Sequence, residues 1–259
     1  MVTPDVTTSS LSITNASGDS NNLMMTQLGG GFTLSKATPL YLEGNAAYAR
    51  FDPVFVASDG MTERSVPTKW NTLSVTIGIG WDFPIAPNWT LRPILNATYG
   101  EVTSDLNIAK WWVEDNTNAD IAFLDNGKMK TYGVGGSLML DYEVFSPGFD
   151  DDLEVRYTNV PLTSEFSVGD VKGHAKADSL SIWARRRVPT GWGWMFERPV
   201  RYVFEGAYTR FFGVQRETGL NQLSSIGFGL EADTSEKDIW VTRVRLVGRY
   251  RFGPGVHGY

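Results

Sequence analysis

The chain of 259 residues contains no cysteine, which excludes disulfides, thiol catalysis and cysteine–zinc sites together. It also contains no run of about 18 apolar residues, so a membrane-spanning helix is excluded. Its 23 basic and 29 acidic residues give a net charge of −6, which argues against a nucleic-acid partner because such a partner requires a basic surface. The only two histidines, His174 and His257, lie far apart in the sequence, and we expect no metal and no other cofactor.

The chain does contain long segments in which apolar and polar residues alternate. Between residues 70 and 83, one face of an extended strand would carry Leu73, Val75, Ile77, Ile79, Trp81 and Phe83, while Thr, Ser, Gly and Asp fall on the other. Residues 84–88 carry two prolines and an asparagine, a turn signal. The alternation then resumes with Trp89, Leu91, Pro93, Leu95, Ala97 and Tyr99 on one face. This stretch predicts a hairpin of two long strands.

Two classes of protein contain such hairpins. A soluble sandwich or lipocalin-like barrel packs the apolar face inward. A transmembrane barrel presents it to lipid and places aromatic residues near both ends. The strands here exceed the 5–6 residues typical of globular sheets, and their polar face carries Gly, Ser and Thr rather than dense Lys and Glu. Both features favour the transmembrane barrel, with Leu73, Val75, Ile77, Leu91 and Leu95 facing lipid.

The same alternation continues along the chain. It predicts further strands at 24–34, 40–48, 131–144, 153–158, 180–188, 200–209, 225–231 and 243–252, with a weak first strand around 11–13 inside the polar segment 1–22. Residues 256–259 begin a twelfth strand that looks incomplete. Because an open sheet edge in lipid leaves backbone groups unpaired, we predict a closed twelve-stranded barrel formed by one domain, 1–259. A ten-stranded barrel is the alternative, but it would put the long loops on the periplasmic side.

The predicted connections differ in length in a regular way. Long polar connections at 52–69, 101–130, 159–178 and 213–222 alternate with short ones at 35–38, 84–88, 146–151 and 233–238, and 189–199 is intermediate. Outer-membrane barrels have short periplasmic turns and long outer loops. The fold class predicted is therefore all-β, a single up-and-down antiparallel transmembrane barrel in the bacterial outer membrane.

This strand count, this loop rhythm and the aromatic-rich final segment VRLVGRYRFGPGVHGY resemble the translocator domain of autotransporters. The closer resemblance is to solitary autotransporter-like barrels without a passenger, because 1–22 is too short for a passenger and a pore-threading helix. The last strand of the family ends in an aromatic residue read by the insertion machinery, and Tyr259 arrives too early for that. The resemblance implies outer-membrane lipid and the barrel-insertion machinery as partners, but not secretion. We expect a monomer.

No arrangement of residues predicts catalysis. His174 lies beside Asp178 and Ser179 in the sequence KGHAKADS, and we interpret it as a solvated loop residue. The His-Ser-Asn signature of the outer-membrane phospholipase is not found. We therefore expect that the protein is not an enzyme and has no catalytic residues. A lipid-hydrolysing enzyme and a surface adhesin using loop 101–130 remain the alternatives.

Charged residues share the polar face of the predicted strands. We expect the lumen to be lined by Arg156, Arg185, Arg187, Arg201, Glu205, Glu231, Arg243, Arg245, Arg249 and Arg251, with further carboxylates at Asp82, Asp141, Glu143 and Glu154. These charges either pair and plug the lumen, or line a water-filled pore that favours anions. For the strand 243–252 we predict that at least two arginines bond to inward carboxylates. The function indicated is a passive narrow pore or membrane scaffold with a charged lumen.

Overall fold

The computed structural model describes residues 5–14, 20–52, 54–58, 63–67, 70–104, 128–166, 172–192, 200–213, 221–233 and 243–259. In these ranges the regular structure is β throughout. No helix in them has the length and apolar character needed to span a bilayer.

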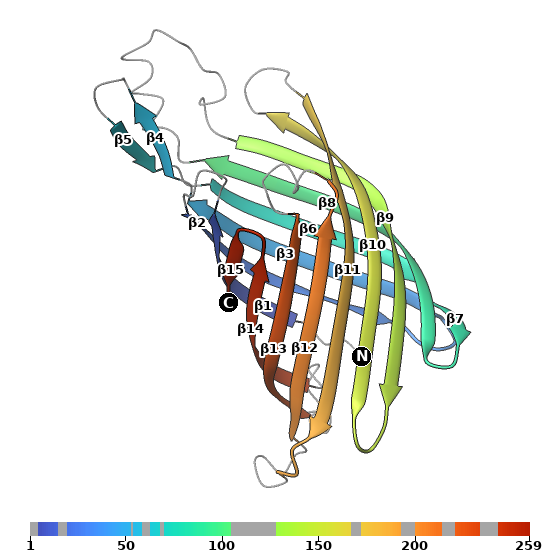
Figure 1. Ribbon diagram of the computed structural model, residues 1–259. Coiled ribbons are helices and arrows are strands. Elements are labelled where there is room, and N and C mark those ends of the chain that lie inside the picture. The colour runs from blue at the N-terminus through green and yellow to red at the C-terminus, as the bar shows by residue number, and fades with distance from the viewer. Residues whose placement is uncertain are drawn as a thin grey trace.

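The wall of the molecule is one antiparallel sheet. Its strands are β1 (Asp5–Thr14), β2 (Ser20–Thr33), β3 (Leu40–Asp52), β6 (Trp70–Trp81), β7 (Phe83–Ala86), β8 (Trp89–Ser104), β9 (Lys128–Phe145), β10 (Asp150–Phe166), β11 (Lys172–Pro189), β12 (Val200–Phe211), β13 (Gln222–Asp233), β14 (Arg243–Gly253) and β15 (Val256–Gly258). A separate hairpin pairs β4 (Val54–Ser58) with β5 (Glu63–Pro67). Figure 1 shows this hairpin beyond the end of the wall at which β3 ends and β6 begins.

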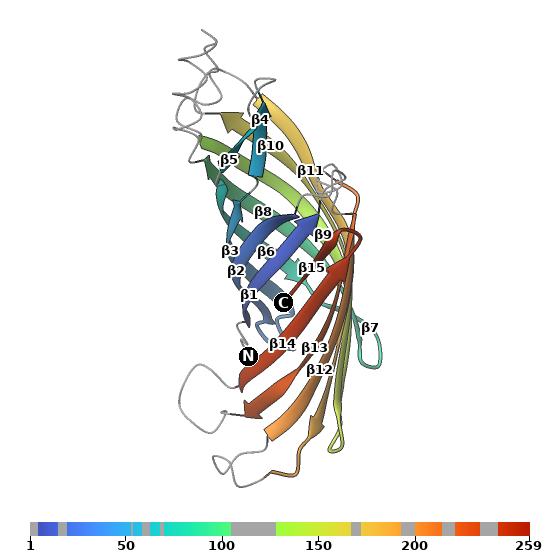
Figure 2. The same ribbon diagram turned by 60° about the vertical axis from the view of Figure 1, so that its left-hand side comes forward.

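The sheet closes on itself. Strands β1 to β3 and β8 to β15 pair in sequence order. β3 pairs with β6 past the separate hairpin β4–β5, β6 pairs with β8 past the short β7, and β15 pairs with both β14 and β1. Figure 2 shows β1, β15 and β14 side by side at this closure. Since β7 continues the line of β6 beyond Asp82, the ring contains twelve strands. The predicted twelve-stranded antiparallel barrel is confirmed, with β15 as its twelfth strand.

The two faces of the wall are inverted relative to a soluble protein. Ile77 is 60% exposed and Leu95 is 59% exposed, whereas Asn96, the next residue along β8, is 1% exposed. Successive side chains of a strand point to opposite faces, so the apolar row points outward and the polar row inward. Of the five residues expected to face lipid, Leu73, Val75, Ile77 and Leu95 are exposed, and the half-buried Leu91 shares their face.

Two predicted loops contain strands instead. The segment 159–178 was predicted to be a polar loop, but β10 continues to Phe166 and β11 begins at Lys172, with Asn159 opposite Asp178. Where a hairpin extends out of the bilayer, backbone hydrogen bonds hold its strands together and neither face contacts lipid. The alternation of apolar and polar residues therefore ends before the strands do. The segment 52–69 likewise holds the hairpin β4–β5. Residues 105–127 of the predicted loop 101–130 lie outside the described part of the chain.

Tight turns connect strands at one end of the barrel. The amide of Leu34 donates to the carbonyl of Leu40 at 2.9 Å, and the amide of Ser146 donates to that of Phe149 at 3.0 Å. Asn88 closes the turn between β7 and β8 with φ 67°, a left-handed conformation that asparagine tolerates better than most residues. Short turns identify the periplasmic end of outer-membrane barrels. We infer from these turns that this end faces the periplasm, although β14 and β15 are joined by a two-residue turn at the other end.

Candidate functional site in the barrel interior

Inward charges on β10 to β14 are brought into rows by the register of the strands. Asp152 is opposite Arg185, Arg185 is opposite Glu205, and Glu205 is opposite Gly227, which in turn is opposite Arg249. Arg201, Glu231 and Arg245 form a second row. Directly opposite residues on neighbouring strands have Cβ atoms about 5 Å apart, so these side chains meet.

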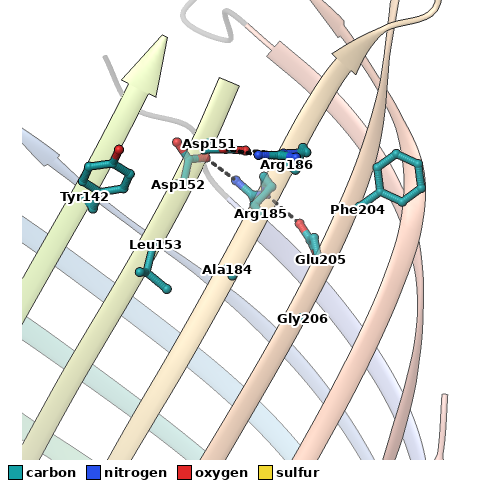
Figure 3. Close-up of a pocket in the computed structure, with 10 residues that line it drawn as sticks. All are labelled: Tyr142, Asp151, Asp152, Leu153, Ala184, Arg185, Arg186, Phe204, Glu205 and Gly206. Atoms are coloured by element: carbon teal, nitrogen blue, oxygen red, sulfur yellow. Dashed lines mark hydrogen bonds and ion pairs between the residues drawn. The ribbon is translucent and has the colours of Figure 1, made fainter. Parts of the chain in front are cut away.

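In the first row, Glu205 accepts hydrogen bonds from two arginines. Its Oε1 accepts a hydrogen bond from Arg185 Nε at 2.8 Å, and its Oε2 accepts one from Arg249 Nε at 2.7 Å. The guanidinium of Arg185 also lies 4.0 Å from Asp152 and over the ring of Trp183, at 4.1 Å from the ring centroid. Figure 3 shows Arg185 between Asp152 and Glu205. Both oxygens of the Glu205 carboxylate are thereby engaged.

Arg187 joins the two rows. It is 2% exposed, and its Nη2 donates to Asp152 Oδ1 at 3.0 Å while its Nη1 lies 3.6 Å from Glu231 Oε1. The other oxygen of Glu231 accepts two hydrogen bonds from Arg245, at 2.9 and 2.6 Å. Asp150 lies 3.9 Å from Arg187 and accepts a hydrogen bond from Arg201.

These contacts form one continuous set, which we call the β10–β14 charge cluster. It comprises Asp150, Asp152, Arg185, Arg187, Arg201, Glu205, Glu231, Arg245 and Arg249. Five arginines face four carboxylates, so the cluster is close to electrically balanced. Removing one partner of a buried ion pair leaves the other charge uncompensated, which makes such a set strongly interdependent.

A second contact crosses the interior. Arg156 on β10 donates from Nη1 and Nη2 to the two carboxylate oxygens of Glu43 on β3, at 2.8 and 2.6 Å. Three strands, β6, β8 and β9, separate β3 from β10 around the wall. Asn96 donates to Glu43 at 2.6 Å, and Ser137 both accepts from Arg156 at 3.1 Å and donates to Asn96 at 2.6 Å. This Glu43–Arg156 bridge therefore connects distant parts of the wall through fully engaged polar groups.

Arg92 forms a third group of contacts, near the periplasmic turns. It bonds to Asp82 and lies 3.2 Å from Asp141 on the neighbouring β9. Its guanidinium lies over the ring of Tyr41, at 4.0 Å from the centroid. Thr33 donates to Asp82 at 2.6 Å. These contacts link β2, β3, β8 and β9 on the inside.

An open space remains beside these contacts. A cavity of about 670 Å³ lies inside the barrel, and its lining includes Glu43, Arg156, Glu205, Arg249 and Arg251. Gly29 and Gly31 on β2 also line it. Ionised side chains surround the cavity, so it suits water or a polar segment better than an apolar ligand.

The structure brings most of the expected lumen residues into contact. Arg185, Arg187, Arg201, Glu205, Glu231, Arg245 and Arg249 all belong to the β10–β14 charge cluster, and Arg156 forms the bridge. Arg251 lines the cavity, and the Arg243 side chain lies outside the described residues. The predicted pairing of at least two β14 arginines with inward carboxylates is confirmed by Arg245 with Glu231 and Arg249 with Glu205.

Four important partners were not among the expected site residues: Glu43, Arg92, Asp150 and Asp152. Arg92 and Glu43 lie on the polar side of clearly alternating strands, so their positions in the alternation indicate that both side chains point inward. Asp150 and Asp152 fall in the predicted turn 146–151 or at its border. The apolar–polar alternation starts only at residue 153, so it does not predict which way these two side chains point.

The described residues offer little for catalysis. His174 is exposed on β11 opposite Thr163, so its expected exposure is correct although its expected loop is a strand. His257 is exposed on β15. In the described ranges no three His, Cys, Asp or Glu residues are grouped so as to hold a metal ion. The chemistry that the interior supports is charge pairing and the exclusion or binding of polar groups.

Comparisons with known proteins agree with this architecture. Residues 5–106 match the profile of the family described as Autotransporter beta-domain. The β domain of the Bordetella autotransporter BrkA is similar over 99% of this chain and 94% of its own, with 15% identity and a TM-score of 0.54. The translocator domain of NalP from Neisseria meningitidis is 9% identical over 99% of this chain and 83% of its own, with a TM-score of 0.54.

A third solved structure has the same shape. The transport unit of the autotransporter AIDA-I from Escherichia coli is 14% identical over 99% of this chain and 86% of its own, with a TM-score of 0.53. A search of curated protein sequences gave no match. The resemblance seen in the sequence is therefore supported by the family profile over 5–106 and by the fold over nearly the whole chain.

Proposed function

We propose that this chain, a bacterial outer-membrane β-barrel with the autotransporter translocator fold, is a passive membrane scaffold whose lumen is bridged by ion pairs. The observation that carries the proposal is the Glu43–Arg156 bridge, which joins β3 to β10 across the interior. A freely conducting pore keeps its lining charges hydrated and apart. Here the carboxylates and guanidinium groups are bonded to one another instead.

The β10–β14 charge cluster supports the same function. Arg187 and Glu231 are each only 2% exposed, so little of their charge is offered to a passing ion. Burying charges is costly unless they pair with good geometry. The bidentate contact of Arg156 with Glu43 provides that geometry, and Arg245 makes two hydrogen bonds to one oxygen of Glu231. We expect the barrel to insert through the barrel-insertion machinery and to act as a monomer in outer-membrane lipid.

A narrow pore is the second candidate, and the cavity of about 670 Å³ favours it. Three arginines and three glutamates line this cavity: Arg156, Arg249 and Arg251 with Glu43, Glu154 and Glu205. Arg249 and Arg251 lie together on β14, so ions passing along that strand would meet more positive than negative charge. Such a pore would select anions.

Single-channel recording in planar bilayers separates the two candidates. For a scaffold, the native barrel should show almost no conductance, and the double variant Glu43→Gln with Arg156→Gln should open measurable steps because the bridge is lost. Arg210→Gln is the matched control, since Arg210 is exposed on the outer face of β12. A native barrel that conducts anions, and that loses this selectivity in the double variant Arg245→Gln with Arg249→Gln, would overturn the scaffold in favour of the pore.

A further inference from the structure

One ion pair lies on the outer face of the barrel, among residues that face lipid. Arg186 on β11 donates from Nε and Nη2 to the two carboxylate oxygens of Asp151 on β10, at 2.7 and 2.6 Å. The Arg186 side chain is 59% exposed. Figure 3 shows the pair spanning the two strands, with Leu153 below it and Phe204 to one side.

The position of the pair along the strands is informative. Asp151 is the second residue of β10, which follows the tight turn at 146–149 at the periplasmic end of the barrel. An outward arginine costs about 2–4 kcal/mol at the bilayer midplane but only about 0–1 kcal/mol near the interface. Phe149 is exposed beside the pair, and the Arg186 guanidinium lies 5.1 Å from its ring centroid. The pair therefore lies at the level of the lipid headgroups in the periplasmic leaflet.

A depression opens next to the pair, toward the middle of the bilayer. Ala184 and Gly206 are opposite each other on β11 and β12, between the larger Leu153 and Phe204. An added Cβ on Gly206 would meet no atom within 4 Å, so the surface is open at this point. The depression has a volume of about 420 Å³, and its lining also includes Tyr142, Asp151, Asp152, Arg185, Arg186 and Glu205.

We propose that this surface binds one phospholipid with a primary ammonium headgroup from the periplasmic leaflet. The headgroup phosphate would accept from Arg186, whose Nη1 donates to no residue in the described part of the chain. The headgroup ammonium would donate to Asp151. An acyl chain would lie over Ala184 and Gly206, where its methylene groups replace the missing side chains.

Charge complementarity selects this headgroup over the others. Arg186 and Asp151 together are neutral, which matches a zwitterion and offers an anionic lipid a carboxylate as well as a guanidinium. A choline headgroup has no N–H and cannot donate to Asp151. The surface thus distinguishes the three common headgroup types by hydrogen bonding and charge.

Native mass spectrometry of the folded barrel, titrated with phosphatidylethanolamine, phosphatidylglycerol or phosphatidylcholine, tests the proposal. One phosphatidylethanolamine should be retained in preference to the other two. The double variant Asp151→Asn with Arg186→Gln should bind it about tenfold more weakly, because charge-assisted hydrogen bonds are lost. Gly206→Leu should weaken it as well, by filling the depression without altering any charge.

Two control variants match these changes elsewhere on the outer face. Arg210→Gln removes an outward arginine that lies beside an aromatic ring, Phe212, and Gly44→Leu fills another outward position with no atom within 4 Å. Both should retain the lipid as the native barrel does, and heat-dependent gel mobility verifies that every variant is folded. Equal retention of the three lipids, or unchanged retention in both Asp151→Asn with Arg186→Gln and Gly206→Leu, would overturn the proposal.

Discussion

Glu43 and Arg156 are 113 positions apart in the sequence, yet two hydrogen bonds of 2.8 and 2.6 Å join them inside the barrel. Their strands are not neighbours in the sheet, so no backbone pairing brings them together. Curvature of the closed ring does so, because it brings inward side chains of β3 and β10 toward each other over the three strands between them. The contact is therefore a property of the barrel as a whole.

The first prediction concerns the coupling of this pair. Arg156→Gln alone and Glu43→Gln alone should each lower the free energy of unfolding by roughly 2–3 kcal/mol, since each leaves a poorly hydrated charge without its partner. The double variant should cost less than the sum of the two. Urea unfolding in lipid, followed by the fluorescence of the nine tryptophans, measures all three. Strict additivity would mean that the two side chains do not interact.

The second prediction compares neighbouring arginines on β11. Arg187 is buried between Asp152 and Glu231, so Arg187→Gln should lower the free energy of unfolding by about 3 kcal/mol. Arg186→Gln should change it little, because exposed ion pairs contribute little to stability. The same unfolding assay applies to both variants. A similar loss in the two would contradict the assignment of opposite faces.

The third prediction uses the absence of cysteine, which allows single labels without background. Spin labels at Leu73→Cys, Ile77→Cys and Leu95→Cys should be accessible to oxygen in bilayers, because these side chains point into lipid. A label at Thr76→Cys should instead report the water-soluble quencher, since Thr76 lines the interior cavity. Oxygen inaccessibility at all three outward sites would be evidence against the membrane-facing surface.

The fourth prediction concerns two glycines that face opposite sides. A Cβ on Gly31 would overlap the phenol of Tyr41, so Gly31→Ala should displace that ring from Arg92 and destabilise the barrel by about 1–3 kcal/mol. Gly44 faces open space, and Gly44→Ala should be neutral or stabilising by about 0.5–1 kcal/mol because alanine loses less backbone freedom. Thermal unfolding distinguishes the two. Equal effects would show that the Tyr41 contact is unimportant.

The wall of the barrel could be predicted from the sequence because lipid and lumen demand opposite polarity from successive residues. The alternation around Ile77 and Leu95 therefore predicts which side chains point to lipid and which point to the lumen. The alternation does not predict strands outside the bilayer, where the two faces of a strand no longer differ in polarity. At Thr163 and His174 the paired strands carry no apolar face, although their backbones remain in register. A hydrophobic pattern cannot reveal strands that are held by backbone hydrogen bonds alone.

The partners of the inward charges could be predicted only in part. Arg245 and Glu231 lie on neighbouring strands, so parity and strand order were enough to bring them together. Glu43 and Arg156 depend on how many strands close the ring and how far the strands are staggered, which no local pattern records. Asp150 and Asp152 depend on where β10 begins, and that boundary lies within a predicted turn.

The Glu43–Arg156 bridge also has a mechanical consequence. The perimeter of a closed sheet is set by its number of strands, each about 4.8 Å from the next, and by their tilt, so it cannot stretch without breaking backbone ladders. A tie of fixed length between two strands that lie four steps apart in a ring of twelve restricts the shape of its cross-section. Any segment thicker than the remaining gap must first break two charge-assisted hydrogen bonds before the walls can separate. The bridge thus restrains the separation of β3 from β10.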